Sequence, residues 1–485
     1  MSKFKEISIY SPKKNYNLLP FRFDRLNTNK VILTNLVGEY LYLEESELSD
    51  LVNLKLDYSN PSFGLLRSKH FIYLSDEKSP HELLALKLRT KFSRLSSFTG
   101  LHIFVLTLRC DHSCPYCQVS RQTENKNTFD MSYETADKSI EYVFRSPSKA
   151  IKIEFQGGEP LLNFELLKYV VLRAKKINQE KQINLQFVIA TTMSLINDEI
   201  LSFCKEHDIS ISSSLDGNQE LHNNNRPRPG KNSHEKFLEG LHKTRETLGF
   251  DRVSALMTTT EESLKDVRSI VDEYVKLGFT GIFLRPLSPY GFAIKTKKFL
   301  AYQAEKWFEF YKEGLAYIIE LNKAGIDFSE QYSSIILSKI LTSNDPGYVD
   351  LMNPSGIGIA ALVYNYDGDV YASDESRMLA EMGDKKFNLG NIHQKSYEEI
   401  MLSDKLLDVL EDSFTLSSPM CSDCAYENYC GSDPVYHHAT QNDIVGRKPE
   451  SDFCKRNMSI FKHLLELMET DDYCKKLFYK WANLC

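Results

Sequence analysis

Ten cysteines occur in this chain of 485 residues, and seven of them fall into two spaced groups. The first group has C-x₃-C-x₂-C spacing and consists of Cys110, Cys114 and Cys117. The second has C-x₂-C-x₅-C spacing with a later fourth member, and consists of Cys421, Cys424, Cys430 and Cys454. Grouped thiols in a long chain without a secretion signal indicate metal or iron–sulfur ligands rather than disulfides.

Three closely spaced thiolates are suited to an iron–sulfur cluster with one reactive iron. A cubane cluster has four irons, so the first group leaves one iron open to a small chelating molecule with an amino and a carboxylate group. Two alternatives remain open at this point. Three ligands and one open position also suit a catalytic zinc ion, and the three thiols can be unrelated.

The region from about 98 to 330 alternates six times between an apolar strand segment and a helical segment. The expected strands are LHIFVLTL, AIKIEFQ, LQFVIATT, SISSSLDG, VSALMTTT and GIFLRPLS. Such units form parallel sheets with right-handed crossovers, and six of them suit a partly open barrel, a partial (β/α)6 TIM barrel of the α/β class. The cysteine loop, the GGEP run and the SLDG run each follow a strand directly, so we expect them to meet at one mouth.

The GGEP run supplies groups that can hold a ligand's ammonium. It consists of Gly157, Gly158, Glu159 and Pro160, and it follows the second expected strand. Glycine lets the backbone approach a ligand closely, and a carboxylate accepts hydrogen bonds from an ammonium group. An ordinary strand-ending turn explains the same four residues equally well when they are taken alone.

Together, LRCDHSCPYCQ and QGGEPLL closely resemble the radical S-adenosylmethionine (SAM) superfamily. The resemblance implies that Cys110, Cys114 and Cys117 hold a 4Fe–4S cluster and that the GGEP run binds the SAM amino group. It further implies a SAM site lined by Tyr116, Thr192, Ser214, Arg226 and Leu287. The third-strand stretch ATTMSL departs from the family, in which many members have an Asn-Gly pair. Asp216 fits a turn or pocket wall better than a general base, and no catalytic residue is assigned beyond the cluster and SAM.

The implied chemistry is a one-electron reaction carried by the cofactor. In the family, the reduced cluster passes an electron to SAM, which cleaves to methionine and a 5′-deoxyadenosyl radical that abstracts hydrogen from substrate. An electron donor such as flavodoxin or ferredoxin is the expected partner.

The second cysteine group resembles the SPASM region, which holds auxiliary clusters in radical SAM enzymes that modify peptides. The full family pattern has cysteine ligands for two clusters. In this chain three of those cysteines are replaced, by Ser355, Ser373 and Pro434. The resemblance therefore implies one auxiliary 4Fe–4S cluster, fully ligated, acting as an electron relay or a structural support. Spacing alone leaves a structural zinc site open.

We expect three domains, at 1–97, 98–330 and 345–485. The first contains strand-like FRFDRL, KVILTNL and EYLYLE, the helical ESELSDLVNL, and then a short helix leading into a strand. This order resembles a winged-helix domain, which often captures a leader peptide by strand addition. The last is a SPASM-like domain with the apolar helical tail RNMSIFKHLLELMET.

The bulk composition excludes several classes of protein. A formal net charge of −7 disfavours nucleic-acid binding. No apolar run approaches the length of a membrane span, and the first residues have no apolar signal core, so we expect a cytoplasmic protein.

The substrate expected from the resemblance is a ribosomally made peptide. CGSDPVYHHATQNDIVGRKP and PFRFDRL resemble the maturases of the His-Xaa-Ser peptide system, which implies a substrate with His-Xaa-Ser repeats and a second radical SAM maturase as partner. The alternatives are a radical SAM enzyme acting on a folded protein, as sulfatase maturases do, or on a small molecule, and a non-enzymatic zinc protein.

Overall fold

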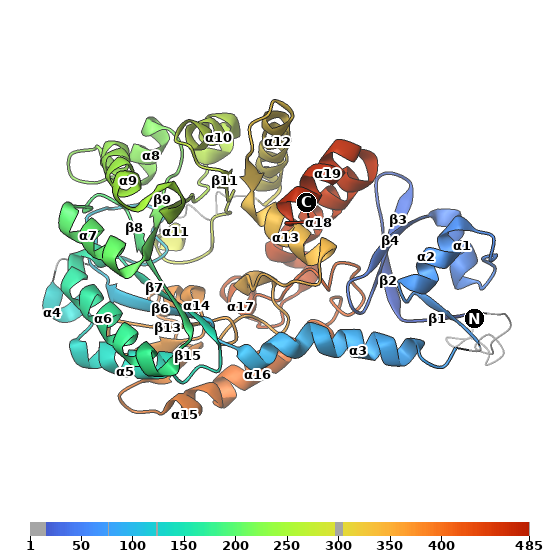
Figure 1. The fold of residues 1–485 in the computed structure, drawn as a ribbon, viewed down its shortest axis with the longest axis horizontal. Helices are drawn as coiled ribbons and strands as arrows, with labels where there is room; N and C mark the ends of the chain where they lie inside the picture. Colours follow the sequence, from blue (N-terminus) through green and yellow to red (C-terminus); the bar gives the residue numbers. More distant parts are fainter. Residues whose placement is uncertain (1–15, 76, 123–124, 296–303, 485) are drawn as a thin grey trace.

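The computed structural model describes residues 16–75, 77–122, 125–295 and 304–484. The N-terminal unit lies at one end of an elongated molecule and the strand–helix region at the other, with the C-terminal helices between them (Figure 1). Among the described helices, none is both long and apolar enough to cross a membrane.

A mixed eight-stranded sheet organises the strand–helix region, in the order β10-β9-β8-β7-β6-β13-β14-β15. Its parallel strands from the first five units are β6 (Leu101–Thr107), β7 (Ala150–Gly157), β8 (Asn184–Thr191), β9 (Ile209–Ser214) and β10 (Val253–Leu256). The helices that follow these strands bury one face against the sheet, as Leu167, Val170 and Val171 do in the second unit. They are α5 (Tyr133–Val143), α6 (Phe164–Lys181), α7 (Asp198–His207), α9 (Ser233–Leu248) and α10 (Val267–Lys276), with the short α4 (Lys126–Phe129) and α8 (Gln219–Asn225) in the loops.

The sixth unit differs from its expected form. Its strand shrinks to β11 (Gly281–Ile282), which pairs with β12 (Ser329–Glu330) and not with the large sheet. Pro286 and Pro289 follow within a few residues, and a proline has no amide hydrogen to continue a ladder. The helix expected from residue 299 is described from 304 onward, as α12 (Ala304–Lys323), because residues 299–303 lie outside the described part. The short α11 (Phe292–Lys295) precedes it.

The C-terminal region extends the large sheet, which the sequence did not indicate. Strand β13 (Ala361–Tyr364) pairs in parallel with β6, and β14 (Asp369–Tyr371) and β15 (Asn388–Asn391) follow in antiparallel order. The remaining helices are α13 (Gln331–Leu341), α14 (Asp374–Ala380), α15 (Tyr397–Met401), α16 (Asp404–Asp412), α17 (Pro434–Gln441), α18 (Asp452–Thr470) and α19 (Asp472–Trp481).

The N-terminal unit has its own apolar core and forms the strands and the helix expected over residues 21–52. Its elements are β1 (Tyr16–Leu18), β2 (Phe21–Arg25), β3 (Lys30–Asn35), β4 (Tyr40–Glu44), α1 (Glu45–Val52), α2 (Pro61–Ser68) and β5 (Ile72–Leu74). β2, β3 and β4 form an antiparallel sheet, β1 pairs with β5, and α3 (Pro80–Phe92) leads to the large sheet (Figure 1).

The same unit is fastened to the segment that carries the second cysteine group. Thr34 donates a hydrogen bond to the carbonyl of Ala425 at 2.6 Å, and both residues are buried. Arg22 and Glu427 form an ion pair at 3.0 Å with side-chain exposures of 9% and 2%. The N-terminal sheet therefore supports the cysteine segment directly.

Candidate functional site

The first cysteine group lies in the loop that follows β6, at the carboxyl end of the parallel strands. Arg109, directly before Cys110, forms two hydrogen bonds of 2.7 Å with the carboxylate of Asp130. At the other end, the Phe292 amide donates to the Cys117 carbonyl at 2.8 Å. Both ends of the loop are thus fixed by groups outside it.

Gly157 and Gly158 allow the end of β7 to lie directly against the residues that precede Cys110. A Cβ on Gly157 would lie 2.1 Å from the Thr107 carbonyl oxygen, and one on Gly158 would lie 2.2 Å from that of Arg109. The Gly158 amide donates to the Thr107 carbonyl at 2.8 Å. Real Cβ atoms do not approach backbone this closely, so both positions require glycine. The structure therefore brings the GGEP run and the cysteine loop together.

Glu159 connects β7 to the end of β8, and its carboxylate is fully buried. One oxygen accepts from the Thr191 hydroxyl at 2.8 Å and the Leu161 amide at 3.1 Å. The other accepts from the amide and hydroxyl of Thr192, both at 2.8 Å. A carboxylate offers about four acceptor positions, so these bonds use them all. Thr192 is also in contact with Ser194, which donates to Asp111 within the cysteine loop.

Asp216 anchors the other side of the loop, a role that its sequence position alone did not indicate. Its buried carboxylate accepts from the Tyr116 hydroxyl at 2.6 Å and from two nitrogens of Arg226 at 3.0 and 3.1 Å. Burial alone would raise the pKa of Asp216, but Arg226 and His222 lower it below its usual value. The signal available in the sequence was the SLDG run followed by the H-x₃-R run.

The remaining predicted residues lie at the same end of the sheet. Ser214 is the last residue of β9 and pairs with Leu256 of β10. Pro160 opens the short 3₁₀ helix that follows the glycines. Leu287 packs against Tyr116 in a small apolar cluster that Cys114 also contacts.

Two thiols of the first group, those of Cys114 and Cys110, have raised pKa values. Burial raises the pKa of Cys114 to about 12, and the neighbouring Cys117 and Asp216 act in the same direction against Arg226. Burial and Glu159 raise the pKa of Cys110 as well. These thiols are therefore protonated at neutral pH, and an iron cluster that binds as a thiolate complex would displace their protons.

The four thiols of the second group converge at the junction between the N-terminal unit and α18. Burial raises the pKa of Cys430, and the nearby thiols of Cys424, Cys421 and Cys454 raise it further. Among the described residues, only Cys110, Asp111 and His112 bring three metal-ligating atoms within 4.8 Å of one another. Neither the three thiols of the first group nor any three thiols of the second group are therefore that close.

The two serines and the proline that stand where the family has cluster cysteines are buried. Ser373 caps α14 through its hydroxyl, which accepts from the Ser376 amide at 3.2 Å, and Pro434 is the first residue of α17. Ser355 is 1% exposed. His437 and His438 form hydrogen bonds with Ser451 and Asp384.

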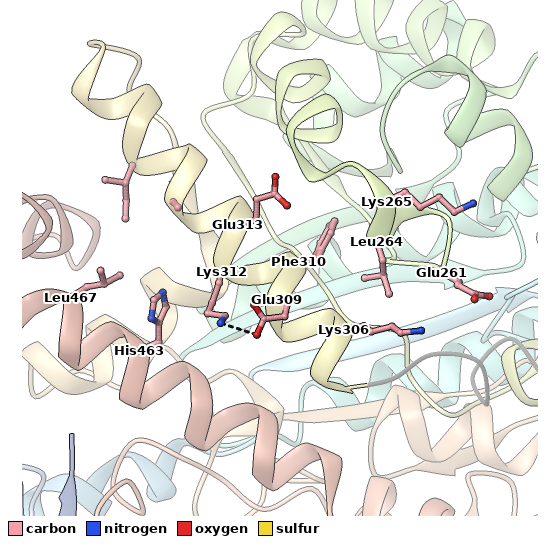
Figure 2. A pocket seen from close by; sticks show the side chains of 12 residues that line it. Glu261, Leu264, Lys265, Lys306, Glu309, Phe310, Lys312, Glu313, His463 and Leu467 are labelled. Carbon is pink, nitrogen blue, oxygen red and sulfur yellow. Dashed lines mark ion pairs between the residues drawn. The ribbon is translucent and has the colours of Figure 1, made fainter. Parts of the chain in front are cut away.

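A large cavity has no cysteine of either group in its lining. It measures about 810 Å³ and lies between α12, α18 and the loop near residue 264 (Figure 2). Its walls are Phe310, Leu264 and Leu467 with charged side chains such as Lys312 and Glu309, and no cysteine lines it. It is therefore separate from the chemistry considered above.

Comparison with known proteins gives a family match on the strand–helix region. Residues 104–274 match the model of the radical SAM superfamily. An uncharacterized protein of Methanocaldococcus jannaschii, MJ0907, is 38% identical over 139 residues, which is 29% of this chain and 45% of that protein. The chain thus spans less than half the length of this relative. A cysteine-type anaerobic sulfatase-maturating enzyme of Clostridium perfringens is 23% identical over 66% of this chain and 84% of its own length.

Two solved structures share the fold. One is anSMEcpe with bound AdoMet and the Cp18Cys peptide, with a TM-score of 0.61, 18% identity, and coverage of 79% of this chain and 99% of that one. The other is Streptococcus suis SuiB bound to its precursor peptide SuiA, with a TM-score of 0.52, 13% identity, and coverage of 91% and 100%. Since the family match begins within β6 and ends within α10, it contains the cysteine loop, the glycine run and Asp216. Residues 104–274 therefore form a domain of the radical SAM superfamily, and the chain as a whole shares the fold of anSMEcpe and SuiB.

Proposed function

We propose that this enzyme matures a ribosomally made peptide. The observation that carries the proposal is the contact between the cysteine loop and the glycine run at the carboxyl ends of β6 and β7. When bound, the cluster and SAM supply a 5′-deoxyadenosyl radical that removes a hydrogen atom from the substrate. The chain's own residues hold SAM and keep water away from it.

In this proposal the SAM amino group lies against the backbone of Gly157 and Gly158. Glu159 fixes that backbone and the end of β8, since its four acceptor positions serve Leu161, Thr191 and Thr192. The strands and helices around them form a partial (β/α)6 barrel whose sixth unit is held by β12.

Ser214, Thr192 and Leu287 complete the proposed SAM pocket. Arg226 is held by Asp216 on the side of Tyr116, which places a guanidinium beside the cysteine loop. A guanidinium in this position suits the SAM carboxylate.

The second cysteine group is proposed to hold one auxiliary 4Fe–4S cluster. Four thiolates on a single zinc ion, at about 2.3 Å from the metal, must lie about 3.8 Å apart. No three of the described thiols lie within 4.8 Å of one another. This spacing is wider than four ligands of one shared zinc ion would have, which favours the larger cluster.

The N-terminal unit is proposed to be a winged-helix-like domain that binds a leader peptide. A groove of about 250 Å³ lies between the sheet and α1, lined by Phe23, Val31, Leu48 and Val52. Phe23 is 44% exposed on β2, which pairs with β3 and has no partner strand on its other edge among the described residues. An added strand could use that edge for backbone bonds and the groove for apolar side chains.

The proposed substrate is a small protein with His-Xaa-Ser repeats, with a second radical SAM maturase and a flavodoxin or ferredoxin as partners. The match to a sulfatase-maturating enzyme over most of that enzyme's length favours a second candidate, modification of a folded protein.

A substitution in the groove separates these two candidates. We expect Phe23→Asp to lower the modified fraction of a co-expressed His-Xaa-Ser peptide at least about tenfold, because it places a charge in an apolar peptide groove. Mass spectrometry of the peptide measures this fraction. Leu172→Asp is the matched control, since Leu172 is 51% exposed on the distant α6.

Equal modification by Phe23→Asp and the unmodified enzyme would contradict the leader-binding role and favour the second candidate. A peptide that keeps its unmodified mass in the presence of intact enzyme, reductant and SAM rules out that peptide as the substrate. Deleting residues 1–95 is a poorer test, because it uncovers the buried Glu427 and the cysteine segment.

A further inference from the structure

A small polar pocket of about 30 Å³ lies between the two cysteine groups. Leu287 forms one wall, and the same side chain packs against Tyr116 of the first cysteine loop. Tyr332 forms another wall, and its hydroxyl donates to Asn457 at 2.8 Å. The Asn457 amide lies 4.0 Å from the sulfur of Cys430 in the second group. The pocket is therefore beside the site of the radical chemistry.

The lining of this pocket has more carboxylates than guanidiniums. Its carboxylates are those of Asp350, Glu375 and Asp433, and its guanidiniums are those of Arg285 and Arg456. Arg285 lies 3.7 Å from Glu375. Three carboxylates against two guanidiniums leave one negative charge if all are ionised. Burial raises the pKa of Glu375 to about 7, with Asp350 as the next contribution, and burial also raises the pKa values of Asp350 and Asp433. A cation bound among these carboxylates would favour their ionised forms and so lower these pKa values.

Tyr290 adds a polar group that faces these carboxylates without a partner. Its side chain is 1% exposed, and its hydroxyl has no hydrogen-bond partner among the described residues. Tyr290 lines the same pocket as Asp433, Glu375 and Asp350, and burial and then these three carboxylates raise its pKa. An unpaired buried hydroxyl costs about 1–3 kcal/mol, and a guest in the pocket could satisfy it.

Two of the replaced cysteine positions are close in sequence to residues that line this pocket. Glu375 follows Ser373 by two residues in α14, and Asp433 directly precedes Pro434 at the start of α17. These two helices pack against each other. The residues that replace cluster ligands are therefore next to the residues that make the pocket acidic.

We propose that this pocket binds the ammonium group of a lysine side chain in the peptide substrate. An ammonium has three donors and no acceptor, which matches a lining of carboxylates and one hydroxyl. A volume of about 30 Å³ admits a group of about the size of a water molecule, and an ammonium is that small. The inference rests on the proposed function, since it requires a peptide substrate.

Two peptides that differ at one position test the pocket. Ac-Gly-Ser-Gly-Lys-Gly-Ser-Gly-NH₂ and its norleucine counterpart are titrated calorimetrically into the reconstituted, full-length enzyme with SAM under anaerobic conditions. We expect the lysine peptide to bind at least about tenfold more tightly, because a charged hydrogen bond contributes about 1.5–3 kcal/mol. Glu375→Gln and Tyr290→Phe should each reduce this ratio, while Glu180→Gln on the exposed face of α6 should not.

Equal affinities, or no binding of the lysine peptide at millimolar concentration, would overturn the assignment. Formation of 5′-deoxyadenosine by the same preparation reports separately on the proposed function. If 5′-deoxyadenosine forms but the lysine peptide does not bind more tightly, only the assignment of the pocket is refuted. If no 5′-deoxyadenosine forms, the proposed function is refuted. Melting temperatures of the variants show whether each one folds, and Tyr290→Phe, which removes a single hydroxyl, decides the outcome if Glu375→Gln is unstable.

Discussion

Replacing Cys114 with alanine is expected to abolish the formation of 5′-deoxyadenosine from SAM. Cys114 is one of three thiols available to the reactive cluster, and its neighbour Arg226 is not a ligand for iron. Bound iron should fall from about eight atoms per chain to about four, because the second cysteine group keeps its own cluster. Anaerobic reconstitution with iron and sulfide analysis, followed by chromatography of the SAM products, measures both quantities.

Cys204→Ala is the matched control for this result. Cys204 is fully buried in α7 and belongs to neither cysteine group. We expect this variant to keep about eight irons and to form 5′-deoxyadenosine. If Cys114→Ala retained the activity or the full iron content, the assignment of the first cysteine group would be wrong.

The second large effect is expected at Asp216, where alanine should lower the free energy of unfolding by about 3–5 kcal/mol. The carboxylate is fully buried and bonded to Arg226 and Tyr116. Removing it leaves the Arg226 guanidinium buried without its countercharge, which costs more than the ion pair itself contributes. Denaturant unfolding of the protein measures the change.

A double substitution shows whether the loss of stability comes from the unpaired charge of Arg226. Asp216→Ala with Arg226→Met removes both charges and should recover much of the lost stability. Asp251→Ala on the exposed surface should change the stability by less than about 0.5 kcal/mol. A loss below about 1 kcal/mol in Asp216→Ala would show that Arg226 has another partner or reaches solvent.

The sequence was informative wherever a motif directly follows a strand. Because the carboxyl ends of parallel strands meet at one edge of a sheet, the positions of the cysteine loop and the glycine run after neighbouring strands predicted that the two would meet. The close approach of Gly158 to Arg109 explains why the run contains two glycines. The strand in each of the first five units also forms where its apolar run predicted it.

Several contacts between segments far apart in the chain could not be predicted from the sequence. Residues 361–364 form β13 beside β6, but an apolar tetrapeptide in turn-rich sequence does not specify its partner strand. The bond between Thr34 and Ala425 joins segments nearly four hundred residues apart, and neither residue type indicates it. The anchoring role of Asp216 depends on Tyr116, which lies one hundred residues earlier.

Formation of 5′-deoxyadenosine by the anaerobically purified enzyme tests the central claim most directly. The protein is incubated with SAM and dithionite, and its iron, sulfide and zinc are determined on the same sample. We predict a brown protein with about eight irons and eight sulfides per chain that cleaves SAM. A colourless protein that contains two zinc ions and leaves SAM intact would contradict the account.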